Sequence, residues 1–225
     1  MKKTIEFLSA LRANNNREWF EAHRGQYTEA LAEFNAFVEK MIAAMPAVDP
    51  ELAGLTLRDC TYRIYRDTRF SHDKTPYKTH MGAYFCPGGK KSGYAGYYFH
   101  VEPAGGGFLG DSLLGIGLYM PQPVELRSVR DEIMDNGKGI DAAVKSSGFQ
   151  LDTENKLKRV PNGYPADSPW AEYLKMKDFS LYRPLDEKLL TAPDLVERVV
   201  EMFRPTVEIN KILNRAVQFA REEMM

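Results

Sequence analysis

Apolar side chains in the first fifth of the chain recur at steps of three and four residues. They run from Trp19 to Met45, with the spacing that places them on one face of an α-helix. Asn15 with Glu18 three residues later fits a capping box, and Pro46 is a stop signal. The pattern predicts one long helix that starts at Asn15 and ends at Pro46, after a short amphipathic segment.

The period changes to two in the middle of the chain. Apolar or aromatic residues alternate with other side chains in 61–67, 83–85 and 97–101, and glycine- and proline-rich stretches separate these segments. Residues 115–120 (GIGLYM) and 179–185 (FSLYRPL) read as two further strands. Such alternation between turn signals is typical of antiparallel strands.

Helical spacing returns after the strand predicted over 115–120. Pro123 stands near the first turn of a helix that continues through Ile133, and residues 138–147 predict a further short helix. Residues 149–160 have the pattern of a polar hairpin. The aromatic and proline residues of 164–177 indicate a loop and a short helix.

The last forty or so residues again show helical periodicity. Thr191 with Asp194 resembles a capping box, and apolar residues follow at helical spacing as far as Phe219. Pro205 lies inside this run, which predicts a kink or two helices. Helices at both ends and strands between them predict an α+β fold, in which long N-terminal and C-terminal helices pack on an antiparallel sheet.

Composition narrows the class of protein. The chain has 225 residues, 44% hydrophobic and 27% charged, which is ordinary for a globular protein and favours a single domain over 1–225. Its net charge of −1 gives no global attraction to DNA or to an anionic membrane. Without an apolar run long enough for a membrane span or a signal peptide, we expect a cytoplasmic protein and no membrane partner.

The two cysteines, Cys60 and Cys86, are too few for a disulfide framework or a cysteine-rich zinc site. They form no CxxC pair. We interpret both as reduced, apolar packing residues rather than catalytic thiols.

Positive charge is concentrated between Arg58 and His80, where six arginines and lysines face three carboxylates. In a strand over 61–67, Arg63 projects on the face opposite Ile64. Turn-forming residues follow this strand, so we expect the rest of the segment to curl over its end as a loop. Loops held by a rigid sheet commonly carry binding groups.

The side chains of this segment suit a small anionic ligand. The planar fork of arginine matches the oxygens of a phosphate or carboxylate, lysine adds a point charge, and hydroxyl groups add neutral donors. We predict that Asp67 orients an arginine and that, in an enzyme, His80 or Asp73 transfers protons. The predicted anion-binding residues are Arg63, Arg66, Asp67, Arg69, Ser71, Asp73, Lys74, Tyr77, Lys78 and His80.

A purely structural role for the same charges is an equally strong interpretation. Arg66 with Asp67 and Asp73 with Lys74 have the composition of an ion-pair network. The carboxylates of the long N-terminal helix offer further partners, namely Glu18, Glu21 and Glu29.

Three sequence blocks resemble a bacterial family of conserved hypothetical proteins, a domain of unknown function. They are FLSALRANNNREWFEAHRGQY at 7–27, YRIYRDTRFSHDKTPYKTHMGAYF at 62–85, and GYYFHVEP at 96–103 with GLYMPQPVELRSVRDEI at 117–133. The resemblance covers most of the chain and implies a stand-alone cytoplasmic domain. It brings no activity, substrate or cofactor, so whether the protein is an enzyme stays open. The stretch GDSLLG at 110–115 is longer than the usual turn of the family.

Gly105, Gly107 and Gly110 spell G-x-G-x-x-G, and Tyr173 with Lys177 spells Y-x-x-x-K, as in short-chain dehydrogenases. A dinucleotide fingerprint needs a strand, a glycine turn and then a helix. Here the glycines lead into another strand, which favours a glycine-rich hairpin instead.

The four histidines show no HExxH spacing, and we assign no metal ligand. A site assembled from His80 and His100 on neighbouring strands with Asp67 is a weaker alternative.

Two other classes of function compete with binding of a small anion. Aromatic residues on an exposed sheet face, beside Arg63 and Arg66, would stack on the bases of a nucleic acid. These residues are Tyr94, Tyr97, Tyr98, Phe99 and Tyr119. The net charge makes nucleic acid the weaker partner, and a protein–protein module without pocket chemistry is the other alternative.

Overall fold

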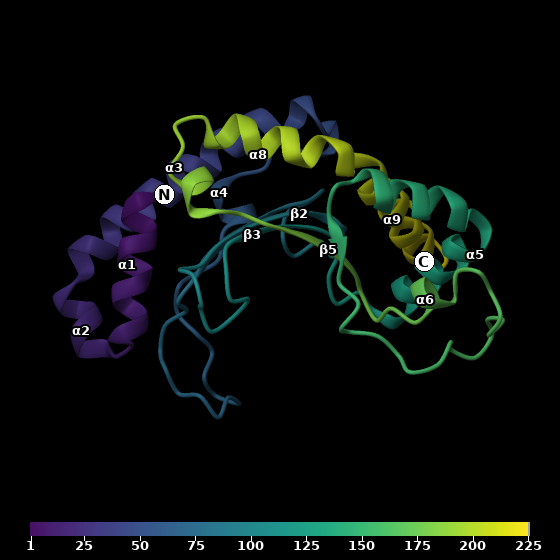
Figure 1. The fold of residues 1–225 in the computed structure, drawn as a ribbon, viewed down its shortest axis with the longest axis horizontal. Coiled ribbons are helices and arrows are strands. Elements are labelled where there is room, and N and C mark those ends of the chain that lie inside the picture. The colour runs from purple at the N-terminus through teal and green to yellow at the C-terminus, as the bar shows by residue number, and fades with distance from the viewer. Residues whose placement is uncertain (225) are drawn as a thin grey trace.

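The computed structural model describes residues 1–224 and has the α+β fold that the sequence predicts (Figure 1). Its centre is one antiparallel sheet of five strands in the order β1-β2-β3-β5-β4. The strands are β1 (Met81–Phe85), β2 (Gly96–Val101), β3 (Leu113–Leu118), β4 (Gln150–Leu151) and β5 (Phe179–Pro184).

Helices precede, interrupt and follow these strands. The α-helices are α1 (Lys2–Ala13), α2 (Arg17–Ala22), α3 (Arg24–Ala44), α4 (Leu57–Cys60), α5 (Pro123–Ser146), α6 (Ala171–Leu174), α7 (Glu187–Leu190), α8 (Leu195–Phe203) and α9 (Val207–Glu222). Short 3-10 helices are η1 (Met45–Ala47), η2 (Pro50–Leu52) and η3 (Arg204–Thr206).

One face of the sheet packs on helices and forms the core. Alternation along β2 sends Tyr97 and Phe99 to this face, where both are buried. Phe99 meets Phe37 of α3 at 4.4 Å between ring centroids, and Tyr97 meets Phe203 of α8 at 5.2 Å. Long helices from both ends of the chain therefore cover the same side of the sheet, as Figure 1 shows for α3 and α8.

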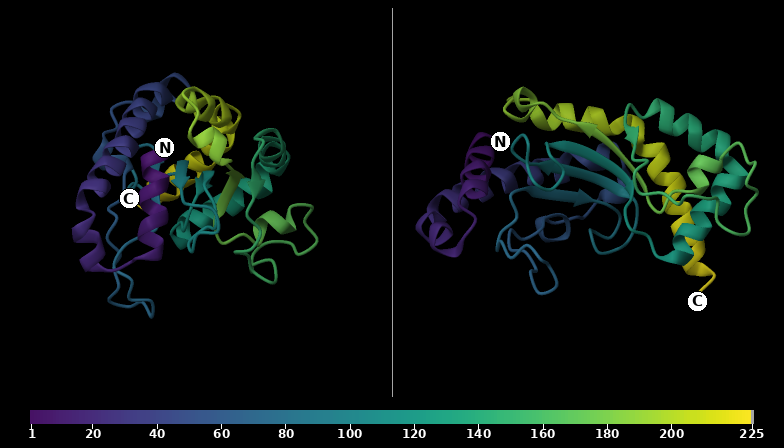
Figure 2. Two further views of the ribbon diagram at one scale, coloured as in Figure 1. Left: turned by 60° about the vertical axis from the view of Figure 1, so that its left-hand side comes forward. Right: turned by 60° about the horizontal axis from the view of Figure 1, so that its bottom comes forward.

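Loops border the other face. Figure 2 shows the blue loop that contains residues 61–80 on the side of the sheet away from α8. The β-strand residues that alternate with the core residues point to this side, among them Tyr84, Tyr98, His100 and Tyr182.

The predicted N-terminal helix is divided. A break at His23 separates α2 from α3, and the cap of α2 is Asn16, whose side chain accepts a hydrogen bond from the Trp19 amide (2.9 Å). Asn15, the predicted cap, instead hydrogen-bonds both backbone groups of Tyr77 (2.9 and 3.2 Å). The predicted end at Pro46 is confirmed, since α3 gives way to η1 there.

The predicted strand over 61–67 is wrong. This extended segment follows the edge of β1 and has only isolated bridges, from Thr61 to Ala83 and from Tyr65 to Tyr77. Its partner includes Pro76, which has no N–H to donate, so a regular ladder cannot continue along it. The Arg66 amide still donates to the Pro76 carbonyl at 2.9 Å.

Two further predictions fail locally. Residues 149–160 do not pair with one another, because β4 joins β5 and the Leu157 amide donates to the Lys175 carbonyl (2.8 Å). Thr191 does not start a helix but ends α7, while Asp194 precedes α8.

The remaining elements agree with the sequence. The other predicted strands are present, β2 and β3 form the glycine-rich hairpin, and η3 separates α8 from α9 at Pro205. The two helices predicted after Pro123 form the single element α5, kinked at Asn136.

Both cysteines are buried and free. Burial raises the pKa of Cys60 to about 12 and that of Cys86 to about 11, so neither thiol is activated as a nucleophile. In the part of the chain that the structure describes, no helix is both long and apolar enough to cross a membrane.

Candidate functional site

A cleft of about 1300 Å³ lies against the loop-bordered face of the sheet. Side chains of β1, β2, β3 and β5 reach it from the sheet, and the segments 61–67, 73–82 and 105–109 also line it. The fold thus brings the arginine-rich segment and the glycine-rich hairpin to one concave place.

Two glycines of the sheet make room for Tyr98 in this cleft. Gly115 lies directly opposite Tyr98 on β3, and a β-carbon there would lie 3.4 Å from the Tyr98 β-carbon. On the other side, a β-carbon at Gly82 of β1 would lie 2.8 Å from Cε2 of the Tyr98 ring. Any larger residue at Gly82 would displace the ring.

Among residues 1–224, two cations of the cleft have neither an ion pair nor a side-chain hydrogen bond, namely exposed Arg63 and half-buried Lys78. Arg12 and Lys90 also lack an ion pair, but they donate to backbone carbonyls. Burial lowers the pKa of Lys78, and the nearby charge of Arg63 lowers it further. The Lys78 ammonium lies 5.5 Å from the centroid of the Tyr62 ring, and the Lys90 ammonium lies 5.7 Å from it. Arg63 and Lys78 therefore face the cleft without an ion-pair partner, while Lys90 donates to the Arg58 carbonyl.

Other cations of the segment are neutralised inside the loop itself. Arg66 forms an ion pair with Asp73 and also contacts Thr75, while Arg69 pairs with Asp67 at 2.7 Å. The Arg69 hydrogen bonds hold the pKa of Asp67 at about 2. The pKa of Asp73 is also lowered to about 2, first by a hydrogen bond from the Thr75 amide and to a smaller extent by one from Arg66.

The carboxylates of the N-terminal helices do not join this network. Glu21 pairs with Arg24 at 2.6 Å, and Glu29 pairs with Lys3 at 2.9 Å. A structural ion-pair network therefore exists, but its pairs differ from those suggested by the sequence, and they join residues of the loop to one another rather than to the N-terminal helices.

The predicted site residues divide into two groups. Arg69, Ser71 and Lys74 do not line the cleft, and the Lys74 ammonium donates to the Thr68 carbonyl (2.9 Å). Tyr77 is buried and stacks on Phe20 at 4.0 Å between centroids. The predicted residues that line the cleft are Arg63, Arg66, Asp67, Asp73, Tyr77, Lys78 and His80.

A polar chain that the sequence reasoning missed runs along β2. The Tyr98 hydroxyl lies 3.0 Å from Nδ1 of His100, and Nε2 of His100 lies 3.1 Å from Oε2 of Glu102. His100 and Glu102 are buried, while Tyr98 lines the cleft. The signal was the spacing of two in GYYFHVEP, which places Tyr98, His100 and Glu102 on one face of a strand.

Glu102 is held as a carboxylate by its surroundings. Burial raises its pKa, but hydrogen bonds from His100 and from the amides of Leu109 (2.9 Å) and Phe108 (3.0 Å) outweigh this effect and bring the pKa to about 2. An ionised Glu102 accepts only, so Nε2 of His100 carries a proton and Nδ1 is left to accept from Tyr98.

His80 lies beside this chain. Its ring centroid is 4.9 Å from that of His100 and 4.4 Å from that of Phe108, on which it stacks. Its Nδ1 atom is buried without a hydrogen-bond partner in the described structure. Burial, and then the neighbouring His100, lowers the pKa of His80 to about 4.

The two histidines are close, as the weaker metal alternative required, but a third ligand is missing. No group of three or more histidine, cysteine or acidic side chains within residues 1–224 is arranged to hold a metal ion. Both ring nitrogens of His100 already have partners.

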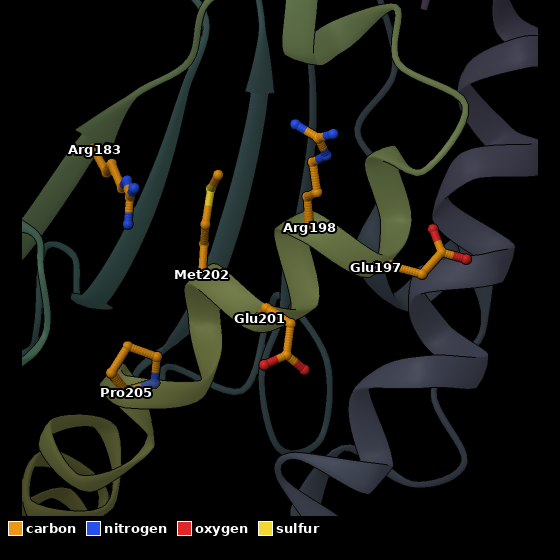
Figure 3. Close-up of a pocket in the computed structure, with 6 residues that line it drawn as sticks. All are labelled: Arg183, Glu197, Arg198, Glu201, Met202 and Pro205. Atoms are coloured by element: carbon orange, nitrogen blue, oxygen red, sulfur yellow. The ribbon is translucent and has the colours of Figure 1, made fainter.

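A second pocket of about 390 Å³ lies between α8 and the end of β5 (Figure 3). Two of its four charged residues are paired along α8, Arg198 with Asp194 at 2.8 Å and Glu201 with Arg204 at 2.8 Å. We place the candidate site in the larger cleft, because most of the predicted site residues line it. The small pocket is lined by Arg183, Glu197, Arg198, Glu201, Met202 and Pro205.

Comparison with known proteins gives one match. The family model described as "Conserved hypothetical protein (DUF2461)" matches residues 3–211, which include every strand and all the cleft residues named above. No curated protein matches the chain, and neither does any solved structure.

Proposed function

The chain belongs to the DUF2461 family of conserved hypothetical proteins, and we propose that its cleft binds a small anionic ligand that carries a phosphate or carboxylate group. The ligand-binding cations are Arg63 and Lys78, with Lys90 beside them. Arg66 is a secondary contact, because a ligand has to compete with Asp73 for its guanidinium.

The observation that carries the proposal is the unneutralised charge of Arg63 and Lys78. Removing a cation from water without a partner costs free energy, and folded proteins ordinarily pair such groups. Lys78 is half-buried beside a second cation. An anion in the cleft would relieve both the repulsion and part of the lost solvation.

The size of the cleft supports a ligand with an organic body as well as an anionic group. Its volume of about 1300 Å³ exceeds the range of roughly 300–1000 Å³ that is typical of small-molecule sites. The rings of Tyr62, Tyr94 and Tyr119 line it and offer apolar surface for that body.

Thermal unfolding with a panel of nucleotides, phosphosugars and carboxylates tests the proposal. A ligand that binds only the native protein raises the melting temperature, and Arg63→Ala should abolish most of that rise. Lys74→Ala is the control, because Lys74 belongs to the same loop but does not line the cleft and donates only to the Thr68 carbonyl. Absence of any shift across the panel, or equal losses in both variants, would contradict anion binding.

Nucleic-acid binding is the second candidate. Tyr62 and Tyr119 are 45% and 69% exposed at the cleft, where they would stack on bases. Tyr97 and Phe99 are core residues, so the stacking surface is smaller than the sequence suggested. Stabilisation by oligonucleotides that weakens steeply with salt would favour this candidate. If neither ligand class binds and a partner protein is retained in pull-downs, the third reading, a protein–protein module, is favoured.

A further inference from the structure

We propose that Tyr98 is the nucleophile of a phosphomonoester hydrolase site and that it acts on a phosphate group bound by the cations of the cleft. This inference rests on the proposed function and adds a reaction to it. It assigns His100 as the base that accepts the Tyr98 proton and Glu102 as the residue that positions His100.

The hydrogen-bond chain of β2 has the order that nucleophile activation requires. A phenol is a weak nucleophile while it is protonated, and burial raises the pKa of Tyr98, so the hydroxyl needs a base in contact with it. Nδ1 of His100 is that base at 3.0 Å. Glu102 at 3.1 Å fixes the proton on Nε2 and stabilises the imidazolium that forms, which is the role of the carboxylate in a hydrolase triad.

The Tyr98 hydroxyl lies near the cationic group of the cleft. The bridge from Thr61 to Ala83 sets Tyr62 beside Gly82, and the Tyr98 ring packs over Gly82. Lys78 and Lys90 both lie within 6 Å of the Tyr62 ring. We place the bound phosphate beside the Tyr62 ring, where these ammonium groups would hold it for attack by the Tyr98 hydroxyl.

A structural role alone does not require this arrangement. Glu102 already fastens the hairpin through the amides of Phe108 and Leu109, so the hairpin does not need His100. Through Nδ1 of His100, the buried pair of His100 and Glu102 is hydrogen-bonded to the Tyr98 side chain, which lines the cleft. Gly82 leaves room for the Tyr98 ring, because the side chain of any other residue at this position would displace the ring.

The reaction balances with water as the only co-reactant. Oη of Tyr98 attacks phosphorus, its proton passes to Nδ1 of His100, and the bond from phosphorus to the alcohol oxygen breaks. The alkoxide departs on the side of phosphorus opposite to Tyr98, takes a proton from solvent and leaves as the alcohol, and a phosphotyrosine remains. Water next attacks phosphorus from that side and loses a proton to solvent, while His100 returns its proton to Oη of Tyr98 as the Oη–P bond breaks, and inorganic phosphate is released.

The test uses p-nitrophenyl phosphate as the probe, with release of nitrophenolate and intact-protein mass as readouts. Tyr98→Phe keeps the ring that packs on Gly82 and should lower the rate by about 100-fold or more. Tyr164→Phe removes a hydroxyl that lies outside the cleft and donates to Asp131 (2.7 Å), and it should leave the rate unchanged. Glu102→Gln should lower kcat more than it raises KM and should change the pH profile, which a loss of packing alone would not do.

Inorganic phosphate separates this inference from the proposed function. We expect inorganic phosphate to raise the melting temperature of wild type and Tyr98→Phe alike. During turnover of p-nitrophenyl phosphate, a rapid acid quench should trap a phosphoryl group on Tyr98 in wild type only. Phosphate binding without nitrophenolate release would overturn the inference and leave anion binding intact. Absence of both overturns both, and a phosphoryl group on any other residue contradicts the role of Tyr98.

Discussion

Lys78 and His80 are two residues apart in the chain, and both are half-buried in the cleft. Lys78 has no carboxylate partner and burial lowers its pKa, whereas His80 is kept neutral at physiological pH by its pKa of about 4. The sequence identified both as candidate residues because they belong to a cation-rich segment. The sequence does not reveal which cations are neutralised, because the conformation of the folded loop determines that Asp67 pairs with Arg69 and Asp73 with Arg66.

The hydrogen-bonded chain from Tyr98 through His100 to Glu102 follows the alternation of β2, but the sequence alone does not identify it as a unit. In the sequence, His100 is a weak candidate metal ligand, and Tyr98 is one aromatic residue among several. What the sequence lacked was the path of the β2–β3 loop, whose amides bind Glu102 and thereby fix its charge. Contacts between a strand and a loop of irregular geometry do not follow from periodicity.

His80 gives the protein an acid-sensitive contribution to stability. Its pKa in the folded protein is about 4, below the ordinary value near 6.5, and the charged groups that face it are His100, Glu102, Lys78 and Arg66. Between these two pKa values the unfolded chain binds a proton that the folded protein does not. Stability is therefore retained above pH 6.5 and is lost as the pH falls toward 4.

The variant His80→Phe removes this titration and keeps the stacking on Phe108. Urea unfolding at pH 7 and pH 4.8 should show that wild type loses about 1–3 kcal/mol more than the variant over this interval. The interval lies above the ordinary pKa range of Glu102, so that group adds little there. An equal loss in both proteins would show that His80 does not titrate with a lowered pKa.

At the scale of elements, the predictions succeeded where the apolar residues follow one clear period. They failed where a single local feature, such as a proline in the neighbouring segment, determines the structure. The strands with clear alternation and the break at Pro205 are as predicted. The segment 61–67 alternates as a strand does, yet its neighbour contains Pro76 and cannot complete the ladder. The break at His23 lies within an uninterrupted apolar stripe, so periodicity alone gave no sign of it.

The strand β3 depends on glycine where it approaches β5. Gly117 has a φ of 105° and a β-carbon there would overlap the Phe179 carbonyl oxygen, whereas Gly105 has a φ of 68° with open space around it. We expect Gly117→Ala to lower the free energy of unfolding by about 2–4 kcal/mol and Gly105→Ala by about 1 kcal/mol. Chemical denaturation measures both. Equal costs would mean that the approach of β3 to β5 is looser than described.

At the scale of the whole molecule, the cleft exists because the sheet has helices on one side and loops on the other (Figure 1). Helices from both ends of the chain bury the apolar face, which the pattern of the sequence predicts. The second face carries glycines, tyrosines and a polar chain instead of an apolar layer. It is therefore left to the irregular segments, whose course no periodicity fixes, and the candidate site lies among them.

The central claim is that the fold keeps an unneutralised cation in this cleft to bind an anion, and Lys78→Met tests it most directly. Methionine keeps an apolar side chain of similar length and removes the charge. Without ligand, the variant should be more stable than wild type by about 0.5–1 kcal/mol, because a half-buried ammonium without a partner is no longer desolvated.

The measurement is the melting temperature of both proteins with and without the best anion of the panel, or inorganic phosphate if none is better. The account predicts that the order of stability reverses: Lys78→Met melts higher alone, and wild type melts higher when the anion is saturating. The contrary result is that, without anion, Lys78→Met melts at a lower temperature than wild type, and that the anion raises the melting temperature of both proteins equally. Lys78 would then be a structural residue, and the cleft would not be an anion site.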